Sequence, residues 1–241
     1  MGSSELERGR LAGQVVSSRA SVVWDLSYES DAPPLFLLPS WMHDGSFPKA
    51  KSLVAAPNAS YSGTLQVDGR RIDVSGWRGS QNHNWGERHT DAYVFGQVAG
   101  FDEAEDSFLE VVSASVNMGP VRTPLSTHLV LRHQDEEYAI VSLRRALLAK
   151  ARYGNFFWDF STSDDRIAIR GRITGCRENF VALNYYNPPG GSKHCLNTKI
   201  GTCQLDLVDK RTGGRQVLHS KNRALMEILT DDKAHGIAVG A

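Results

Sequence analysis

ASYSGTLQV at residues 59–67, DG at residues 68–69 and RRIDVSGW at residues 70–77 form the stretch of sequence that decides the fold. Apolar and polar residues alternate on both sides of Asp68-Gly69, which is the period-two pattern of a half-buried strand. Asp-Gly between two such segments favours a type I′ turn, because glycine accepts the positive φ that this turn requires. We therefore predict a β-hairpin over residues 59–77.

Short segments of the same kind recur along the rest of the chain. Residues 143–152 contain good helix formers, but the segment spans too few turns for its pattern to decide whether it is a helix. Residues 224–229 fit either a final helical turn or an edge strand. Many short strands separated by polar turns predict an all-β sandwich or barrel. The other predicted strands cover residues 21–28, 93–101, 108–116, 127–132, 138–143, 156–161, 166–174, 180–186, 195–208 and 216–220.

The composition of the chain disfavours several classes of function. The 241 residues allow one large all-β domain or two small ones, and 27 Lys and Arg balance 27 Asp and Glu. A neutral chain disfavours nucleic-acid binding, and no run of Lys or Arg in the sequence indicates a membrane-surface patch. No apolar run reaches the roughly 20 residues of a transmembrane helix. The N-terminus lacks the apolar core of a secretory signal, and the three cysteines contain no CxxC pair, so we expect a cytoplasmic protein.

Polar and aromatic residues concentrate in two places. Gly76–Thr90 holds two Trp, two His, two Asn and a Gln. This segment either plugs one end of a barrel, with Trp85 packed and the polar groups satisfied, or lines a ligand cavity. The second concentration covers residues 184–199 and includes Asn184. Within it, we expect four side chains to lie at strand ends, where they can point into a barrel mouth: Tyr186, His194, Asn197 and Lys199.

The chemistry that these residues support is limited. His83 and His89 are six positions apart with no third ligand at a suitable interval, so we predict no metal site. The sequence contains no GxGxxG, Walker or GxSxG motif, and we therefore predict no cofactor and no serine nucleophile. An aromatic, amide-rich site can hold an apolar ligand and move a proton through His or Tyr. Trp faces can also stabilise a carbocation.

One set of motifs resembles a known superfamily. Gln81-Asn-His-Asn-Trp-Gly86, Arg88-His89, Tyr93-Val-Phe-Gly-Gln97 and Phe101 are similar to segments of hydroxyneurosporene synthase (carotenoid 1,2-hydratase), the tocopherol cyclases and the AttH-like proteins. The resemblance implies a lipocalin-like (calycin) antiparallel β-barrel fold. Members act on prenyl, polyene or polyketide-derived substrates by hydration, cyclisation or pericyclic ring formation, without a metal or nucleotide.

The resemblance also implies two lipocalin-like lobes, which we place at residues 1–100 and 101–241. Only about 80 residues precede the Asn-Trp-Gly turn, fewer than is usual in the superfamily. We therefore expect a first lobe that is reduced or that starts late, and a homodimer becomes a possible partner arrangement. Hydration usually requires a carboxylic acid, and we interpret Glu87 and Asp91, which lie near the motif, as solvated charges.

Three functions follow from these residues. The first is a cofactor-independent isomerase, cyclase or hydratase acting on an apolar isoprenoid, polyene or polyketide-like substrate. The second is a non-catalytic carrier of lipids or other apolar molecules, and the third is an interaction protein whose barrel is filled by side chains. For the enzyme, the predicted catalytic residues are His83, His89 and Tyr93. The predicted substrate-binding residues are Trp77, Gln81, Asn84, Trp85, Arg88, Gln97, Asn184, Tyr186, His194, Asn197 and Lys199.

Overall fold

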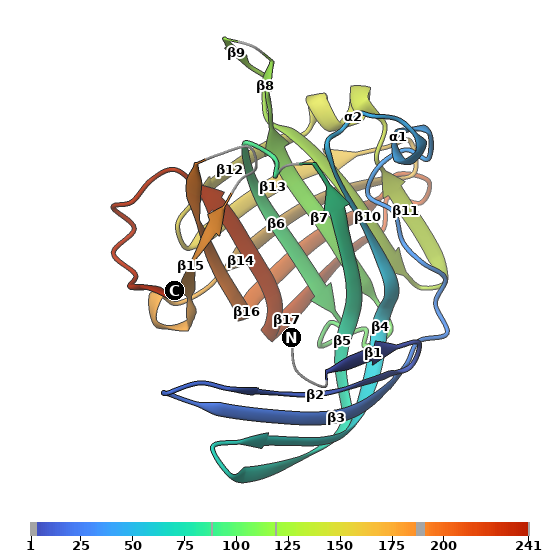
Figure 1. Ribbon diagram of the computed structural model, residues 1–241. Helices are drawn as coiled ribbons and strands as arrows, with labels where there is room; N and C mark the ends of the chain where they lie inside the picture. Colours follow the sequence, from blue (N-terminus) through green and yellow to red (C-terminus); the bar gives the residue numbers. More distant parts are fainter. Residues whose placement is uncertain (1–3, 88, 119, 187–190, 241) are drawn as a thin grey trace. The chain divides into compact units, whose positions relative to one another are not determined.

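The chain folds mainly into β-strands, and most strand pairs are antiparallel. The computed structural model describes residues 4–87, 89–118, 120–186 and 191–240 (Figure 1). The strands of the first sheet are β1 Glu5–Glu7, β2 Arg10–Val16, β3 Ser21–Glu29, β4 Ala50–Val67 and β5 Arg70–Gly86. Those of the second sheet are β6 Ala92–Ala99, β7 Phe108–Ser115, β10 Ser126–His133, β11 Glu136–Ile140, β12 Lys150–Gly154, β13 Phe157–Ser163, β14 Ile167–Thr174, β15 Val181–Tyr186, β16 Ser192–Asp209, β17 Arg215–Thr230 and β18 Val239–Gly240.

Few residues are helical, and one pair of strands lies outside these two sheets. A short separate hairpin is formed by β8 Asn117–Met118 and β9 Val121–Arg122. The helices are α1 Trp41–Asp44, α2 Leu143–Leu148 and the 3-10 helix η1 Arg177–Asn179. Among the described residues, no helix has both the length and the apolar character that crossing a membrane requires.

The hairpin predicted from Asp68-Gly69 is confirmed. β4 ends at Val67 and β5 begins at Arg70, so the two residues between them form the turn. Asp68 and Gly69 have φ angles of 50° and 82°, both positive as a type I′ turn requires. The Asp68 carboxylate also accepts a hydrogen bond of 2.8 Å from the backbone N–H of Ser21 at the start of β3. The turn is therefore fixed by its own residues and by the neighbouring strand.

The contacts within the chain define two compact units. One consists of Met1–Leu35 and Val54–Asn82, and the other of Phe36–Leu53 and His83–Ala241. We call them the first unit and the second unit. Their boundaries differ from the predicted lobes at residues 1–100 and 101–241, and that division into two lipocalin-like lobes stays a prediction.

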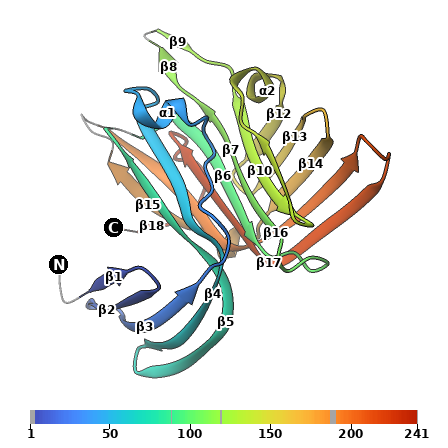
Figure 2. The same cartoon turned by 90° about the vertical axis from the view of Figure 1, so that its right-hand side faces the viewer.

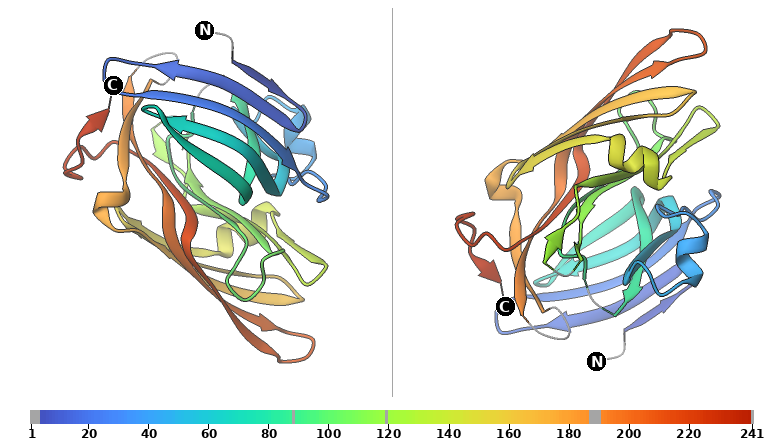
Figure 3. Two further views of the ribbon diagram at one scale, coloured as in Figure 1. Left: turned by 90° about the horizontal axis from the view of Figure 1, so that it is seen from below. Right: turned by 90° about the horizontal axis from the view of Figure 1, so that it is seen from above.

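The sheet of the second unit follows the strand order β11-β10-β7-β6-β17-β16-β14-β13-β12, with β15 and β18 attached beside β16 (Figures 1 and 2). Residues 224–229 belong to β17, which pairs with β16 on one side and with β6 on the other. The expectation of a helical turn or an edge strand there was therefore wrong. The hairpin of β16 and β17 (orange to red in Figure 3) contains the two longest strands of this sheet.

A β-bulge interrupts the pairing of β16 with β17 near Gly201, where the register shifts on both sides. Before it, Leu196 packs into the hydrophobic core and Asn197 pairs beside Glu227 on the opposite face. After it, the odd-numbered Cys203 and Leu205 pack into the core. The extra residue therefore reverses which residues of β16 face the core.

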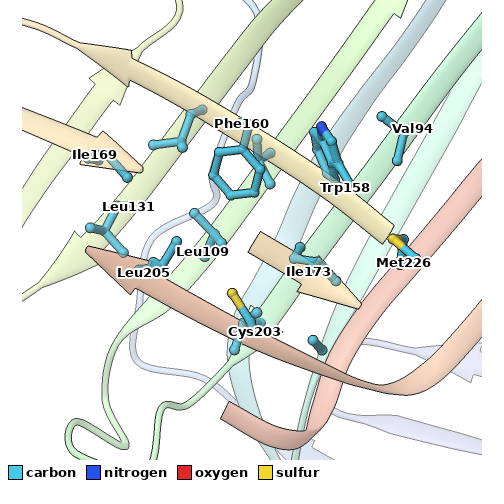
Figure 4. Close-up of a cluster of buried hydrophobic side chains, with 14 of the residues drawn as sticks. Val94, Leu109, Leu131, Trp158, Phe160, Ile169, Ile173, Cys203, Leu205 and Met226 are labelled. Atoms are coloured by element: carbon cyan, nitrogen blue, oxygen red, sulfur yellow. The ribbon is translucent and has the colours of Figure 1, made fainter. Parts of the chain in front are cut away.

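One face of this sheet forms a core that is filled by side chains. Figure 4 shows buried apolar side chains from several strands of the sheet gathered in one cluster, which includes Trp158 and Phe160. Their ring centroids are 4.9 Å apart, and both side chains are buried. Each fully buried side chain of this size stabilises the fold by about 1.5–3 kcal/mol. Gly96 on β6 faces this core without a side chain, which leaves room for Trp158 and Ile173.

Candidate functional site

Polar side chains gather on the face of the sheet opposite the filled core. The register pairs Phe95 of β6 with Glu227 of β17, and Glu227 in turn with Asn197 of β16. Because paired residues point to the same side and alternate residues share a face, Tyr93 and Gln97 of β6 lie on that side too. Gln97 pairs with Glu110 of β7. We call the set of Tyr93, Gln97, Glu110, Asn197 and Glu227 the polar row.

Both carboxylate oxygens of Glu227 accept hydrogen bonds from side chains. The Tyr93 hydroxyl donates to Oε1, and the Asn197 amide donates to Oε2 at 2.6 Å. Burial, and next the negative charge of Glu227, raise the pKa of Tyr93 far above its ordinary value. Tyr93 therefore keeps its proton and acts as a hydrogen-bond donor. Tyr93 and Glu227 are half-buried while Asn197 is buried, so the carboxylate combines fixed partners with partial exposure.

Further polar groups surround Glu227. Cys195 is buried, and burial followed by the charge of Glu227 raises the pKa of its thiol to about 12. It is therefore a neutral thiol at physiological pH and a poor nucleophile. Burial and Glu227 also raise the pKa of Tyr185. The rings of Tyr185 and His89 are 5.2 Å apart, which connects the predicted catalytic His89 to this group of residues. The positive charge of Lys199, whose side chain is exposed, also interacts electrostatically with Glu227.

The second carboxyl of the polar row has a different environment. Glu110 is 2% exposed, and its Oε2 accepts a hydrogen bond of 2.6 Å from the side-chain amide of Gln97. Burial raises the pKa of Glu110 to about 8, although the hydrogen bond from Gln97 acts in the opposite direction. Glu110 therefore carries a proton at neutral pH. Two carboxyls on one face of the sheet are thus held in different environments, a pattern associated with acid–base sites.

The predicted residues at the end of β5 form a separate aromatic group. The ring of His83 stacks on Trp85, with centroids 5.5 Å apart and planes 18° apart. The ring centroid of His43, a residue of α1, lies 6.1 Å from that of Trp85. Asn84 is exposed, and Trp85 is 37% exposed. The residues of this group belong to the second unit, and within the described part of the chain none of them forms a hydrogen bond or ion pair with the polar row.

Other predicted residues lie elsewhere. Trp77 and Gln81 belong to the first unit, where Trp77 is 50% exposed and Gln81 donates to the backbone carbonyl of Asn82 at 3.3 Å. Arg88 lies outside the residues that the structure describes.

Three predicted residues of β15 and β16 lie on the opposite face from Asn197. Asn184 pairs with His194, and alternation places Tyr186 on the same side as both. Tyr186 is 76% exposed, and His194 Nδ1 forms a hydrogen bond of 2.7 Å with Nε2 of His235. The fold therefore brings Tyr93, Gln97 and Asn197 to one face, with Lys199 and His89 near it, and separates them from His194.

The sequence reasoning missed Glu110 and Glu227. Each stands in an otherwise apolar strand, in FLEVVSAS at residues 108–115 and in RALMEILT at residues 223–230. A carboxylate inside such a run is rare unless it is paired, and that was the available signal. Their partners are remote in sequence, since Tyr93 and Glu227 are separated by 134 positions.

Two hollows of the second unit do not include the polar row. One, of about 470 Å³, is lined by residues of β12, β13, β14 and β16. The other, of about 1270 Å³, is lined mainly by α2, β13, β14, β16 and β17. Both lie on other parts of the sheet, so a substrate at the polar row would contact different residues.

This chain is similar in sequence to known proteins. No family model matches. The uncharacterized protein Rv0493c of Mycobacterium tuberculosis, strain H37Rv, and its counterpart MT0513 in another strain of that species are each 28% identical over 210 residues. The match covers 86% of this chain, which spans 60% of the length of each relative.

The similar solved structures include kievitone hydratase from Nectria haematococca, with a TM-score of 0.57, and a structure described as an AttH protein from Nitrosomonas europaea, with a TM-score of 0.54. Each is 12% identical to this chain, and each comparison covers 92% of this chain and 65% of the other. The fold is lipocalin-like. The predicted all-β, lipocalin-like class is therefore confirmed.

Proposed function

We propose that this protein is a hydratase-type enzyme of the AttH and carotenoid-hydratase superfamily, and that Glu227 transfers the proton. The observation that carries the proposal is that Tyr93 and Asn197 donate hydrogen bonds to the two oxygens of the half-buried Glu227 carboxyl group. Such a carboxyl is fixed in position and remains partly exposed to a reacting molecule. Glu110 is less suitable as the reacting group because it is almost fully buried.

Addition of water to a carbon–carbon double bond requires one proton on one carbon and the oxygen of water on the other. Before the reaction, the half-buried Glu227 carboxylate takes up a proton from solvent. It then gives this proton to the first carbon, which leaves a carbocation and the carboxylate that Tyr93 and Asn197 hydrogen-bond. The hydrogen bonds from Tyr93 and Asn197 stabilise the developing negative charge. Water then bonds to the cationic carbon and returns a proton to Glu227, so the enzyme ends the cycle unchanged. Loss of a proton from another carbon, instead of attack by water, would give an isomerised or cyclised product.

Two findings support this assignment. Kievitone hydratase, whose name states the reaction type, has the same fold over 92% of this chain. The Gln81–Gly86 and Tyr93–Gln97 motifs resemble a superfamily that acts on apolar molecules, so we propose an isoprenoid, polyene or polyketide-like substrate. The rings of His83 and Trp85, which stack on each other, are suited to contact such a substrate.

The test is incorporation of oxygen from labelled water. Purified protein is incubated with kievitone, with farnesol as an isoprenoid and with retinol as a polyene, in water that contains heavy oxygen. Mass spectrometry then detects a product that has gained one water molecule. We expect Glu227→Gln to reduce the rate by about a hundredfold or more, the usual contribution of a positioned acid–base group. Tyr93→Phe, which removes one of two donors to the carboxyl, should reduce it less.

The matched control is Glu178→Gln, which neutralises an exposed carboxylate in η1. Thermal unfolding of each variant shows whether a loss of rate reflects a loss of fold. If Glu227→Gln converts a substrate as fast as the wild-type protein, Glu227 is not the proton donor. If apolar molecules bind and are recovered unchanged, the protein is a carrier and the enzymatic assignment is wrong.

A further inference from the structure

Helix α2 exposes leucines where a short surface helix usually exposes polar residues. Its sequence is LRRALL, and Ala146 is fully buried, which fixes the face of the helix that packs on the protein. The side chains of Leu143, Leu147 and Leu148 are 43%, 54% and 71% exposed. Leu143 and Leu147 are four residues apart and so lie on one side of the helix. The helix therefore presents an apolar surface to solvent at one end of the sheet's strands (Figure 2).

Basic side chains lie beside one of these leucines, Leu148. Leu148 lines the hollow of about 1270 Å³, together with the six basic residues Arg144, Arg145, Lys150, Arg170, Lys210 and Arg215. The same hollow contains three aspartates, Asp164, Asp165 and Asp206. The chain as a whole has no net charge, so this hollow is a local excess of positive charge on a neutral molecule.

Several of these cations are not neutralised by nearby groups. Arg145 forms an ion pair of 2.8 Å with Asp165, and Lys210 donates to the backbone carbonyl of Asp164 at 2.7 Å. In the described part of the chain, the side chains at 144, 150, 170 and 215 have no ion pair or hydrogen bond. Their charges remain available for an external anion.

These cations come from distant parts of the sequence. Arg144 and Arg215 are separated by 71 positions, and the sheet brings them to one hollow by placing α2, β14 and β17 together. The sequence has no run of basic residues, which is why it did not indicate a membrane-surface patch. The folded protein has a basic surface that the linear sequence does not show.

We propose that α2 and this basic hollow bind the surface of a membrane that contains anionic phospholipids. Arg and Lys are attracted to the phosphate groups of such a surface, and exposed leucines are stabilised when they enter the region between headgroups and acyl chains. A soluble polyanion would use the charges alone. The exposed leucines of α2, one of which lines the basic hollow, therefore favour a lipid surface. This inference does not depend on the proposed hydratase activity. A membrane-bound protein would, however, lie near any apolar substrate dissolved in that membrane.

Vesicle flotation tests the proposal with the chain of 241 residues. We expect the protein to float with vesicles of phosphatidylcholine mixed with phosphatidylglycerol, and weakly or not at all with phosphatidylcholine alone. The double variant Leu147→Ser/Leu148→Ser should bind the mixed vesicles about tenfold or more weakly, because two apolar side chains no longer enter the membrane. The control is Val16→Ser, since Val16 has the same exposed fraction as Leu148, 71%, and belongs to the first unit.

Charge-reversal variants test the contribution of the basic side chains. Arg144→Glu/Arg170→Glu should weaken binding to the mixed vesicles, and added salt should weaken binding of the wild-type protein. The control is Arg70→Glu, at an exposed position of the first unit. The proposal is overturned if the wild-type protein does not float with the mixed vesicles. It is also overturned if only the charge variants lose binding, because the surface then binds soluble anions without inserting its leucines.

Discussion

The buried carboxyl of Glu110 makes the stability of the protein depend on pH. Its pKa is about 8 in the folded protein, compared with an ordinary value of 4.5, because burial disfavours the charged form. Between these two values the folded state keeps a proton that the unfolded state releases. The stabilisation is therefore fully present below pH about 4.5, decreases as the pH rises, and is lost above pH about 8.

The size of the effect follows from the difference between the two pKa values. Each pKa unit corresponds to about 1.36 kcal/mol, so the free energy of unfolding should decrease by about 5 kcal/mol from low to high pH. That is a large part of the roughly 5–15 kcal/mol that stabilises a typical domain. Glu110→Gln keeps the shape of the side chain and can still bond to Gln97, but it stays neutral at every pH. We expect the variant to lose this part of the pH dependence.

Urea unfolding, followed by circular dichroism from pH 5 to 9, measures the prediction. Wild-type and Glu110→Gln proteins should have similar free energies of unfolding at pH 5, and the variant should be more stable by several kcal/mol at pH 9. The control is Glu178→Gln, since an exposed carboxyl should leave the pH profile unchanged. The reasoning is wrong if the profiles of wild-type and Glu110→Gln proteins remain parallel over the whole range, because other titratable groups are common to both.

Two further changes test the packing and the chain end. Gly96→Ala should reduce the free energy of unfolding by about 1–3 kcal/mol, because the added Cβ would lie 2.6 Å from Cδ1 of Ile173 and 2.9 Å from Cζ3 of Trp158. Ile173→Val removes that Cδ1, so the double variant should recover part of the loss in urea unfolding, and an additive loss would contradict this account. Burial, and next the charge of His194, lower the pKa of His235. Neutral His235 is therefore favoured in the folded state, and hydrogen-exchange protection at the C-terminal β18 should decrease as the pH falls through about 6.5. His235→Gln should remove this dependence, and protection that is equally pH-dependent in the variant would show that His235 is not its source.

Local signals predicted much of the fold. Asp68-Gly69 identified the β4–β5 hairpin because a type I′ turn requires particular residues at two adjacent positions. Alternation also predicted most strands of the second sheet. It failed at residues 224–229, because a short apolar run with a single charge does not distinguish a helical turn from a strand. The sheet decides the matter, since β17 is paired on both sides.

The site was harder to predict than the fold. Tyr93, Gln97 and Asn197 were selected from the polar and aromatic composition of their segments, and all three lie in the polar row. Their carboxyl partners were not selected, because Glu110 and Glu227 lie in apolar strands away from the motifs. The identity of a cross-strand partner depends on register and strand order, which are properties of the whole sheet. His194 shows the same limit, because neighbouring residues of one strand point to opposite faces.

The β-bulge near Gly201 gives β16 an unequal tolerance to changes in chain length. Substitutions along the strand alter one side chain at a time and leave the others in place. Deletion of a single residue at the bulge would remove the reversal that it creates, so that either Asn197 or Cys203 would have to exchange its environment. Related sequences that keep both the polar row and the filled core should therefore vary in residue type along this strand while keeping the number of residues between these two positions constant.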